Sequence, residues 1–140
     1  MRDYILDANV IMSMLISGKA IYKSLLKEYT FFSSDFAFIE IEKYQNVIQS
    51  KTKIDAENFK HFSYYLFSHV HFMPTYLIEN NVKQKALKLV EDIDTKDVAY
   101  VALSIQLDIP LLTRDIPLYE GLRKKGFRNV QLFDAFLRNA

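Results

Sequence analysis

The residues best suited to chemistry in this sequence are acids that stand beside short apolar runs. Asp7 directly follows the apolar residues 4–6, and Asp115 closely follows the run 111–113. Asp97 stands near the start of a helical pattern, with Asp94 just before it. Clustered carboxylates repel one another and are usually neutralised by hydrated divalent cations, and oxygen-only ligands favour Mg²⁺ or Mn²⁺ over zinc. Such ions can generate hydroxide from water and stabilise the leaving oxygen of a phosphodiester.

Each of these acids also has a purely structural interpretation. Asp94 and Asp97 could cap a helix and interact with its dipole. Asp115 precedes Ile116-Pro117 and could be a turn or N-cap residue, and Asp7 could cap the helix that follows it. Two further acids, Glu40 and Glu42, lie inside a helical pattern, where an acid usually belongs to a solvated face. The functional interpretation therefore depends on whether the acids meet at one place.

The hydrophobic pattern predicts how they meet. It alternates short apolar strands with helices, which favours a single α/β domain over residues 1–140: a three-layer fold with a mostly parallel sheet of about four to five strands and helices on both faces. Right-handed crossovers in such a sheet bring strand ends and the starts of following helices to one edge, so we expect the acids there. We predict strands at 4–6, 30–33, 70–73, 111–113 and 129–131, and helices at about 8–16, 18–29, 35–50, 54–68, 77–91 and 95–107, with a short helix after residue 115. Ile21, Leu25 and Leu26 are predicted to face the core from the second helix, and Leu77 from the helix at 77–91.

The composition excludes several other kinds of site. There is no cysteine, so disulfides and thiolate chemistry are excluded. The three histidines lack the spacing of a zinc site, and three glycines cannot supply a glycine-rich phosphate loop. The acidic N-terminus is unlike a signal peptide and no apolar run approaches the roughly 20 residues of a membrane span, so we expect a cytoplasmic protein.

The net charge of +1 at first argues against a nucleic-acid partner. Taking four metal-bound carboxylates from the 17 acids leaves 13 against 18 basic residues, a balance of +5. A metal-loaded protein would therefore be mildly basic toward a phosphate backbone.

Four blocks in order along the chain resemble the PIN-domain family. They are the strand and acid YILDAN at residues 4–9, the helix FIEIEKY at 38–44, the segment DTKDVAYVAL at 94–103, and the closing LLTRD at 111–115. Any one block is a weak signal, but four at compatible spacing are a strong one. The small single-domain form is most similar to the VapC-like toxin ribonucleases of that family, which are paired with an antitoxin.

The resemblance implies a divalent-metal-dependent endoribonuclease that hydrolyses RNA, the toxin of a toxin–antitoxin pair. It implies Mg²⁺ or Mn²⁺ as cofactor, an RNA substrate, a cognate antitoxin and a homodimer, with no membrane partner. By position, the metal-binding and catalytic acids would be Asp7, Glu40, Asp97 and Asp115. Asp94 is a fifth candidate ligand, Asn9 and Thr113 would orient ligands or waters, and Glu42 is the alternative to Glu40 two residues on.

A basic run and an aromatic run complete the candidate features. Arg114, Arg123, Lys124 and Lys125 are candidate phosphate contacts, although such a run is usually a solvated face. Aromatic residues over 59–66 are expected in the core, with a dimer or antitoxin surface as the alternative. A non-catalytic PIN-fold module that binds RNA or protein is the competing function. A phosphoryl-accepting receiver-like domain ranks lower, because the acidic pair and the lysine that it needs are missing.

Overall fold

Two central strands are short, apolar and almost wholly buried, which is the pattern of a parallel sheet covered by helices. The computed structural model describes residues 2–140, and within that range the sheet has five strands, all parallel, in the order β3-β2-β1-β4-β5. Every residue of β4 is buried, and so are the three residues of β1 that follow Asp3. The strands are β1 (Asp3–Leu6), β2 (Thr30–Ser34), β3 (Val70–Met73), β4 (Leu111–Thr113) and β5 (Val130–Leu132).

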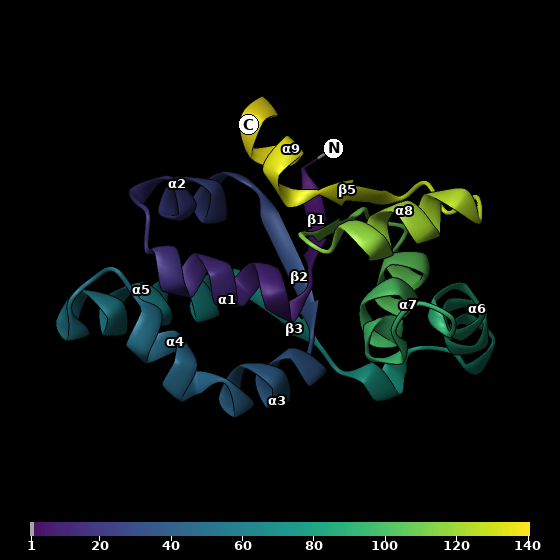
Figure 1. Ribbon diagram of the computed structural model, residues 1–140, viewed down its shortest axis with the longest axis horizontal. Helices are drawn as coiled ribbons and strands as arrows, with labels where there is room; N and C mark the ends of the chain where they lie inside the picture. Colours follow the sequence, from purple (N-terminus) through teal and green to yellow (C-terminus); the bar gives the residue numbers. More distant parts are fainter. Residues whose placement is uncertain (1) are drawn as a thin grey trace.

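Helices cover both faces of this sheet (Figure 1). The helices α1, α2 and α5 lie on one face together with α9, and α3 and α4 pack on the outer side of α1; α6, α7 and α8 cover the other face. The predicted three-layer α/β fold is therefore confirmed. The helices are α1 (Ala8–Ser17), α2 (Ala20–Glu28), α3 (Phe36–Lys43), α4 (Gln45–Lys51), α5 (Ala56–His69), α6 (Asn80–Val90), α7 (Val98–Leu107), α8 (Ile116–Lys124) and α9 (Phe133–Asn139), with 3-10 helices η1 (Thr75–Leu77) and η2 (Thr95–Asp97).

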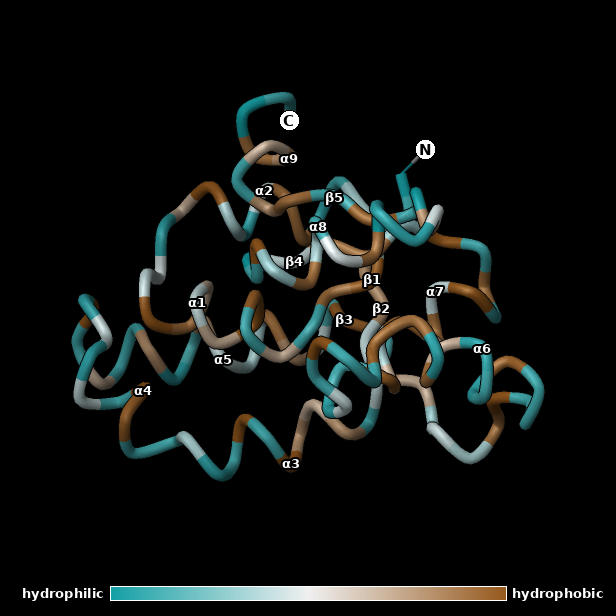
Figure 2. The backbone as a smooth tube through the Cα atoms, turned by 45° about the vertical axis from the view of Figure 1, so that its right-hand side comes forward, coloured by the Kyte–Doolittle hydropathy of each residue, from teal (hydrophilic) through white to brown (hydrophobic). Residues whose placement is uncertain are grey.

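The chain connections explain this division. The order of the strands reverses direction after β3, and right-handed crossovers then place the connecting helices on the opposite face. Figure 2 shows the result: hydrophobic residues concentrate at the central strands, while the outer helices alternate between hydrophobic and hydrophilic residues. Within the described range, no helix combines the length and apolar character needed to cross a membrane.

Local signals set several helix ends. Asp7 Oδ1 accepts a hydrogen bond from the backbone N–H of Val10 at 2.9 Å and so begins α1. At the other end of α1, Gly18 adopts the left-handed conformation with φ of 59°, which a residue without Cβ tolerates best. Asp55 caps α5, and Asp115 caps α8 with Pro117 in its first turn.

Three sequence predictions about helices were wrong. The single helix expected at 35–50 is two helices, because the backbone leaves the helical conformation at Tyr44. Leu77 is 59 % exposed in η1, ahead of α6, instead of facing the core. Ile21 is 52 % exposed, and Tyr22 is buried in its place because it packs against Phe133 of α9, a helix that the sequence pattern did not predict.

Candidate active site

The carboxyl edge of the sheet gathers the predicted acids from four separate segments. Asp7 follows β1, and Asp115 follows β4, the neighbouring strand. Glu40 comes from α3, which follows β2, and Asp97 ends η2 where α7 begins. In Figure 1 the strands β1 and β2 run toward the end of the molecule where α3 lies. The fold therefore delivers these residues to one edge, as parallel topology requires.

Asp7 is buried and held by two hydrogen bonds. Oδ1 accepts from the Val10 N–H, and Oδ2 accepts from the Thr113 hydroxyl at 2.7 Å. Burial nevertheless raises the pKa of Asp7 from its usual 3.8 to about 6, because the two hydrogen bonds only partly offset desolvation and because Asp115 and Glu40 add negative charge nearby. The carboxylate is thus fixed in orientation but incompletely neutralised.

Asp97 is the least satisfied of the acids. Its Oδ2 is buried and has no hydrogen-bond partner among the residues that the structure describes. Burial raises its pKa to about 7, and the charges of Asp7, Asp94, Asp115 and Glu40 contribute to the same rise. A buried carboxylate oxygen without a donor is costly and calls for an explanation, such as a cation. Asp97 therefore differs from an ordinary helix cap, and its side chain makes no capping bond to α7.

Thr113 connects two of the acids. Its hydroxyl donates to Asp7 and accepts the backbone N–H of Asp115 at 3.1 Å. Asp115 in turn accepts the N–H of Leu118 at 3.0 Å. One hydroxyl thereby fixes the relative positions of the side chain that follows β1 and the backbone turn that follows β4.

Glu40 and Glu42 lie differently. Glu40 is partly buried, and its Oε1 accepts a hydrogen bond from the Tyr100 hydroxyl at 2.8 Å. Glu40 contributes to the raised pKa values of Asp7 and Asp97, whereas Glu42 is exposed and contributes to neither. Sequence reasoning missed Tyr100, although it lies three residues after Asp97 and so on the same side of α7.

Two further predicted residues flank the acids. Asp94 accepts the N–H of Lys96 at 3.1 Å, and its carboxylate lies 3.6 Å from the Lys96 ammonium group. Asn9 is exposed and lines a cavity of about 300 Å³ together with Glu40 and Lys96. Lys96, which the sequence patterns did not single out, thus lies beside the acids.

The predicted phosphate contacts do not share one location. Arg114 forms an ion pair with Asp134 at 3.9 Å, and Lys125 donates to the Leu89 carbonyl at 2.9 Å and pairs with Asp92. Arg123 lies over the Tyr119 ring. Arg123 and Lys124 line a cavity of about 730 Å³ along α8, which begins beside Asp115 at Ile116.

The acidic edge offers oxygen ligands that suit a hard cation. All candidate ligands are oxygens, and the orphaned Oδ2 of Asp97 is the kind of atom that a bound Mg²⁺ or Mn²⁺ would satisfy. As the side chains lie in residues 2–140, however, no three acidic or histidine groups are close enough to share one ion. The set fits a divalent cation in chemistry, and closer approach of the carboxylates would accompany its binding.

Comparisons with known proteins agree with this fold. No curated protein sequence matches the chain. Its structure is similar to a toxin–antitoxin complex from Klebsiella pneumoniae, with a TM-score of 0.60, 13 % identity, and 91 % of this chain and 95 % of that chain covered. It is also similar to VapBC2 from Rickettsia felis bound to a promoter DNA fragment, with a TM-score of 0.61, 17 % identity, and 93 % and 96 % covered. A family model described as the PIN domain matches residues 5–133, nearly the whole chain, and the chain therefore belongs to the PIN-domain family.

Proposed function

We propose that the chain is a divalent-metal-dependent endoribonuclease that hydrolyses phosphodiester bonds of RNA. The observation that carries the proposal is the convergence of carboxylates from four segments on one sheet edge, where Asp97 Oδ2 is buried and has no partner among residues 2–140. A protein that only needed helix caps would gain nothing from holding these charges together, since their repulsion destabilises the fold.

The residues divide into ligands and groups that position them. Asp7, Glu40, Asp97 and Asp115 would hold Mg²⁺ or Mn²⁺, with Asp94 as a further ligand. Bound cations would supply an activated water and stabilise the leaving oxygen. Thr113 orients Asp7 through its 2.7 Å hydrogen bond, and Tyr100 orients Glu40 through its bond of 2.8 Å.

Substrate approach depends on the positive groups near these acids. Lys96 is the nearest candidate, because it lines the cavity that also contains Asn9 and Glu40. Arg123 and Lys124, along α8, offer a more distant contact for the phosphate backbone.

A toxin role in the cytoplasm, with an antitoxin as protein partner and a homodimer as the assembled form, extends this proposal. Its support is that both structural neighbours named above come from toxin–antitoxin systems. Expression of the chain in a bacterium should then arrest growth, and normal growth at high expression would contradict the toxin role.

A non-catalytic PIN-fold module that binds RNA or protein is the second candidate. The observation in its favour is that, within residues 2–140, no three acids lie close enough to share an ion. The two candidates differ in whether the protein cleaves RNA when divalent cations are present.

The two glutamates of α3 give a sharp test of the nuclease proposal. Single-stranded RNA is incubated with the protein in Mn²⁺ or in chelator, and cleavage is followed on a gel. We expect cleavage only with Mn²⁺, a loss of at least about tenfold in Glu40→Gln, and wild-type cleavage in Glu42→Gln. Glutamine retains an oxygen that can accept the Tyr100 hydrogen bond, so the loss would reflect charge and not folding.

Two outcomes would change the conclusion. Equal activity of the two variants would remove Glu40 from the metal site. An RNA that stays intact with Mn²⁺, together with an unchanged melting temperature, would favour the non-catalytic module, because a ligand that binds only the folded state must stabilise it.

A further inference from the structure

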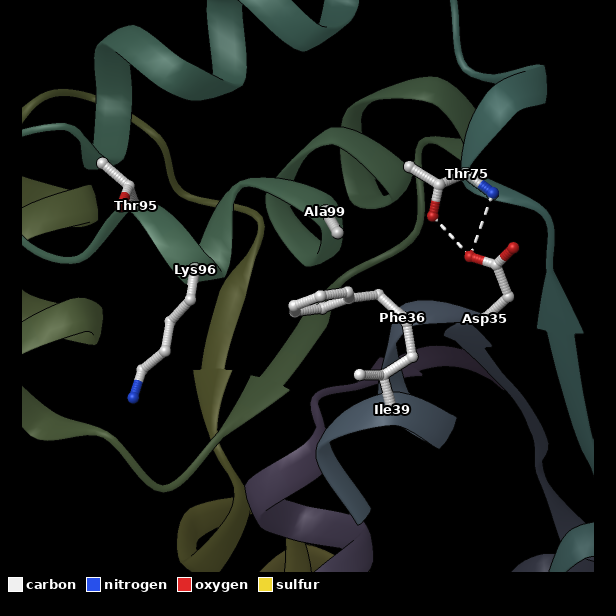
Figure 3. A pocket seen from close by; sticks show the side chains of 7 residues that line it. All are labelled: Asp35, Phe36, Ile39, Thr75, Thr95, Lys96 and Ala99. Carbon is white, nitrogen blue, oxygen red and sulfur yellow. Dashed lines mark hydrogen bonds between the residues drawn. The ribbon is translucent and has the colours of Figure 1, made fainter. Parts of the chain in front are cut away.

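A further pocket lies beside the acids, between the start of α3 and the start of α7. Its volume is about 420 Å³ (Figure 3). Phe36 and Ile39 of α3 form one side, and Thr95, Lys96 and Ala99 lie across from them. No residue of this pocket belongs to the acidic set, so the proposed chemistry leaves the pocket unexplained.

Phe36 contributes an aromatic ring to this pocket. It is half-buried, projects into the pocket, and makes no contact with another aromatic ring in the part of the chain that the structure describes. Two residues on, Phe38 packs on Phe67 and Phe72, at centroid distances of 5.9 and 4.1 Å. Beside Phe36, Ile39 is 63 % exposed. The pocket is therefore lined by an aromatic ring and by an exposed apolar side chain.

A third side of the pocket, formed by Asp35 and Thr75, is fixed by hydrogen bonds. Asp35 Oδ1 accepts the backbone N–H of Thr75 at 3.1 Å and the Thr75 hydroxyl at 2.5 Å, as Figure 3 shows. The Thr75 hydroxyl also lies 3.0 Å from that of Ser34. These bonds join the start of α3 to η1, so the pocket is already formed and a ligand would not have to order it.

The pocket is continuous with the acidic edge through η2. Lys96 lines this pocket and also the cavity that contains Asn9 and Glu40, and Asp97 is the next residue along the chain. A chain of alternating phosphates and flat bases could place a phosphate near Lys96 and the acids while one base enters the pocket. Unpaired bases of RNA are commonly bound by stacking on aromatic side chains.

We propose that this pocket binds the base of an unpaired nucleotide next to the phosphate that is cleaved, stacking it on Phe36. The inference rests on the proposed ribonuclease function for the identity of the substrate. It makes Phe36 a substrate-binding residue, and it predicts that the protein selects single-stranded over paired RNA, since a paired base cannot leave its stack without cost.

Coupling between the ring and one base tests the proposal. Affinities are measured by fluorescence anisotropy in Mn²⁺ for a labelled single-stranded RNA and for versions with one abasic nucleotide at successive positions. An Asp115→Asn background prevents cleavage. We expect Phe36→Leu to weaken binding of the intact RNA by about tenfold, typical of losing one stacked base. One abasic position should weaken binding to the Phe36 protein equally, and should cost the Phe36→Leu protein almost nothing.

Matched controls separate this effect from folding and charge. Phe59→Leu removes another half-buried ring that packs on the core, from α5, and should leave affinity unchanged. If Phe36→Leu fails to fold, Ile39→Glu puts a negative charge in the pocket and should weaken binding at least tenfold. Ile21→Glu, at an exposed site on α2, is its control and should bind like the unmodified protein.

The outcomes also separate this proposal from the nuclease proposal. Cleavage by the wild-type protein without coupling between Phe36 and any base overturns the base pocket alone. Coupling without cleavage keeps the pocket and overturns the nuclease. A Phe36→Leu protein that changes its sedimentation mass but not its affinity for RNA would show a protein-binding surface instead, and absence of RNA binding would overturn both proposals.

Discussion

The two ends of β1 are surrounded by opposite kinds of environment. Near its start, Tyr4 packs in a cluster of rings, with centroid distances of 4.8 Å to Phe136 and 5.9 Å to Tyr29. Just past its end, three residues later, Asp7 is buried among other carboxylates and its pKa is raised to about 6. Apolar contact at the first end stabilises the folded state, whereas desolvation and charge repulsion at the second end destabilise it.

The contrast indicates which contacts offset the destabilisation that the buried acids cause. The rings of Tyr4, Tyr29, Phe31 and Phe136 contact one another across β1, β2 and α9. Aromatic pairs of this kind contribute about 0.5–1.5 kcal/mol each beyond the area that they bury. The stability that the cluster provides can offset the cost of burying charged groups at the carboxyl edge. These acids are suited to chemistry even though they destabilise the fold.

Removing a ring from the aromatic end should have the largest effect. Phe136 is 5 % exposed and contacts the three other rings of the cluster and, in addition, Phe133. We expect Phe136→Ala to lower the free energy of unfolding by about 3–5 kcal/mol in urea titrations. Phe136→Leu, which keeps much of the volume, should cost clearly less. A loss below about 1 kcal/mol for the alanine variant would show that α9 is dispensable. It would contradict the view that the aromatic cluster provides the stability that offsets the acidic edge.

The acidic end should reveal itself in the pH dependence of the metal-free protein. A folded pKa above the unfolded one means that the folded state binds the proton more tightly, so stability is greatest below the unfolded pKa of about 4. It should then fall as the pH rises from about 4 to about 7. The rise at Asp7 alone corresponds to about 3 kcal/mol, since one pKa unit is about 1.4 kcal/mol. Urea titrations in chelator at successive pH values measure it.

Asp97→Asn is the control for this profile. Asparagine cannot ionise, so the pH dependence should become shallower, with the contribution of Asp7 remaining. The metal-free protein at pH 7 should be as stable as the wild type or more so. The same variant should lose Mn²⁺-dependent cleavage. If it is instead less stable at pH 7 and fully active, Asp97 acts only through the charge–dipole interaction at the helix start, about 0.3–1 kcal/mol, and the acidic edge is not a functional site.

The acidic edge was more accessible to sequence reasoning than the aromatic cluster. Asp7 directly follows an apolar strand and Asp115 closely follows another, and parallel topology alone brings strand ends together. The cluster depends on α9, whose seven residues are too few for a clear helical period, and so the burial of Tyr22 and the exposure of Ile21 were missed. The burial of Asp97 and the Tyr100–Glu40 bond also escaped prediction, because they depend on how α7 packs against α3 and not on local pattern.

The smallest expected effect concerns the basic residues at the end of α8, Lys124 and Lys125. The comparison between the two ends of β1 does not assign them to either end. Lys125 is held by the Leu89 carbonyl and by Asp92, whereas Lys124 is exposed and lines the cavity along α8. A lysine already bound to the protein gains little from a phosphate, so Lys125→Gln should lower the melting temperature slightly and leave RNA affinity unchanged. Lys124→Gln should do the reverse: its melting temperature should stay the same, and its affinity should fall about two- to threefold at low salt and less at high salt, as for the loss of one phosphate contact. Anisotropy and thermal melts of both variants measure this. If Lys125→Gln instead weakens RNA binding without any change in melting temperature, its bonds to Leu89 and Asp92 yield to the phosphate, and the basic run belongs with the functional end of the molecule.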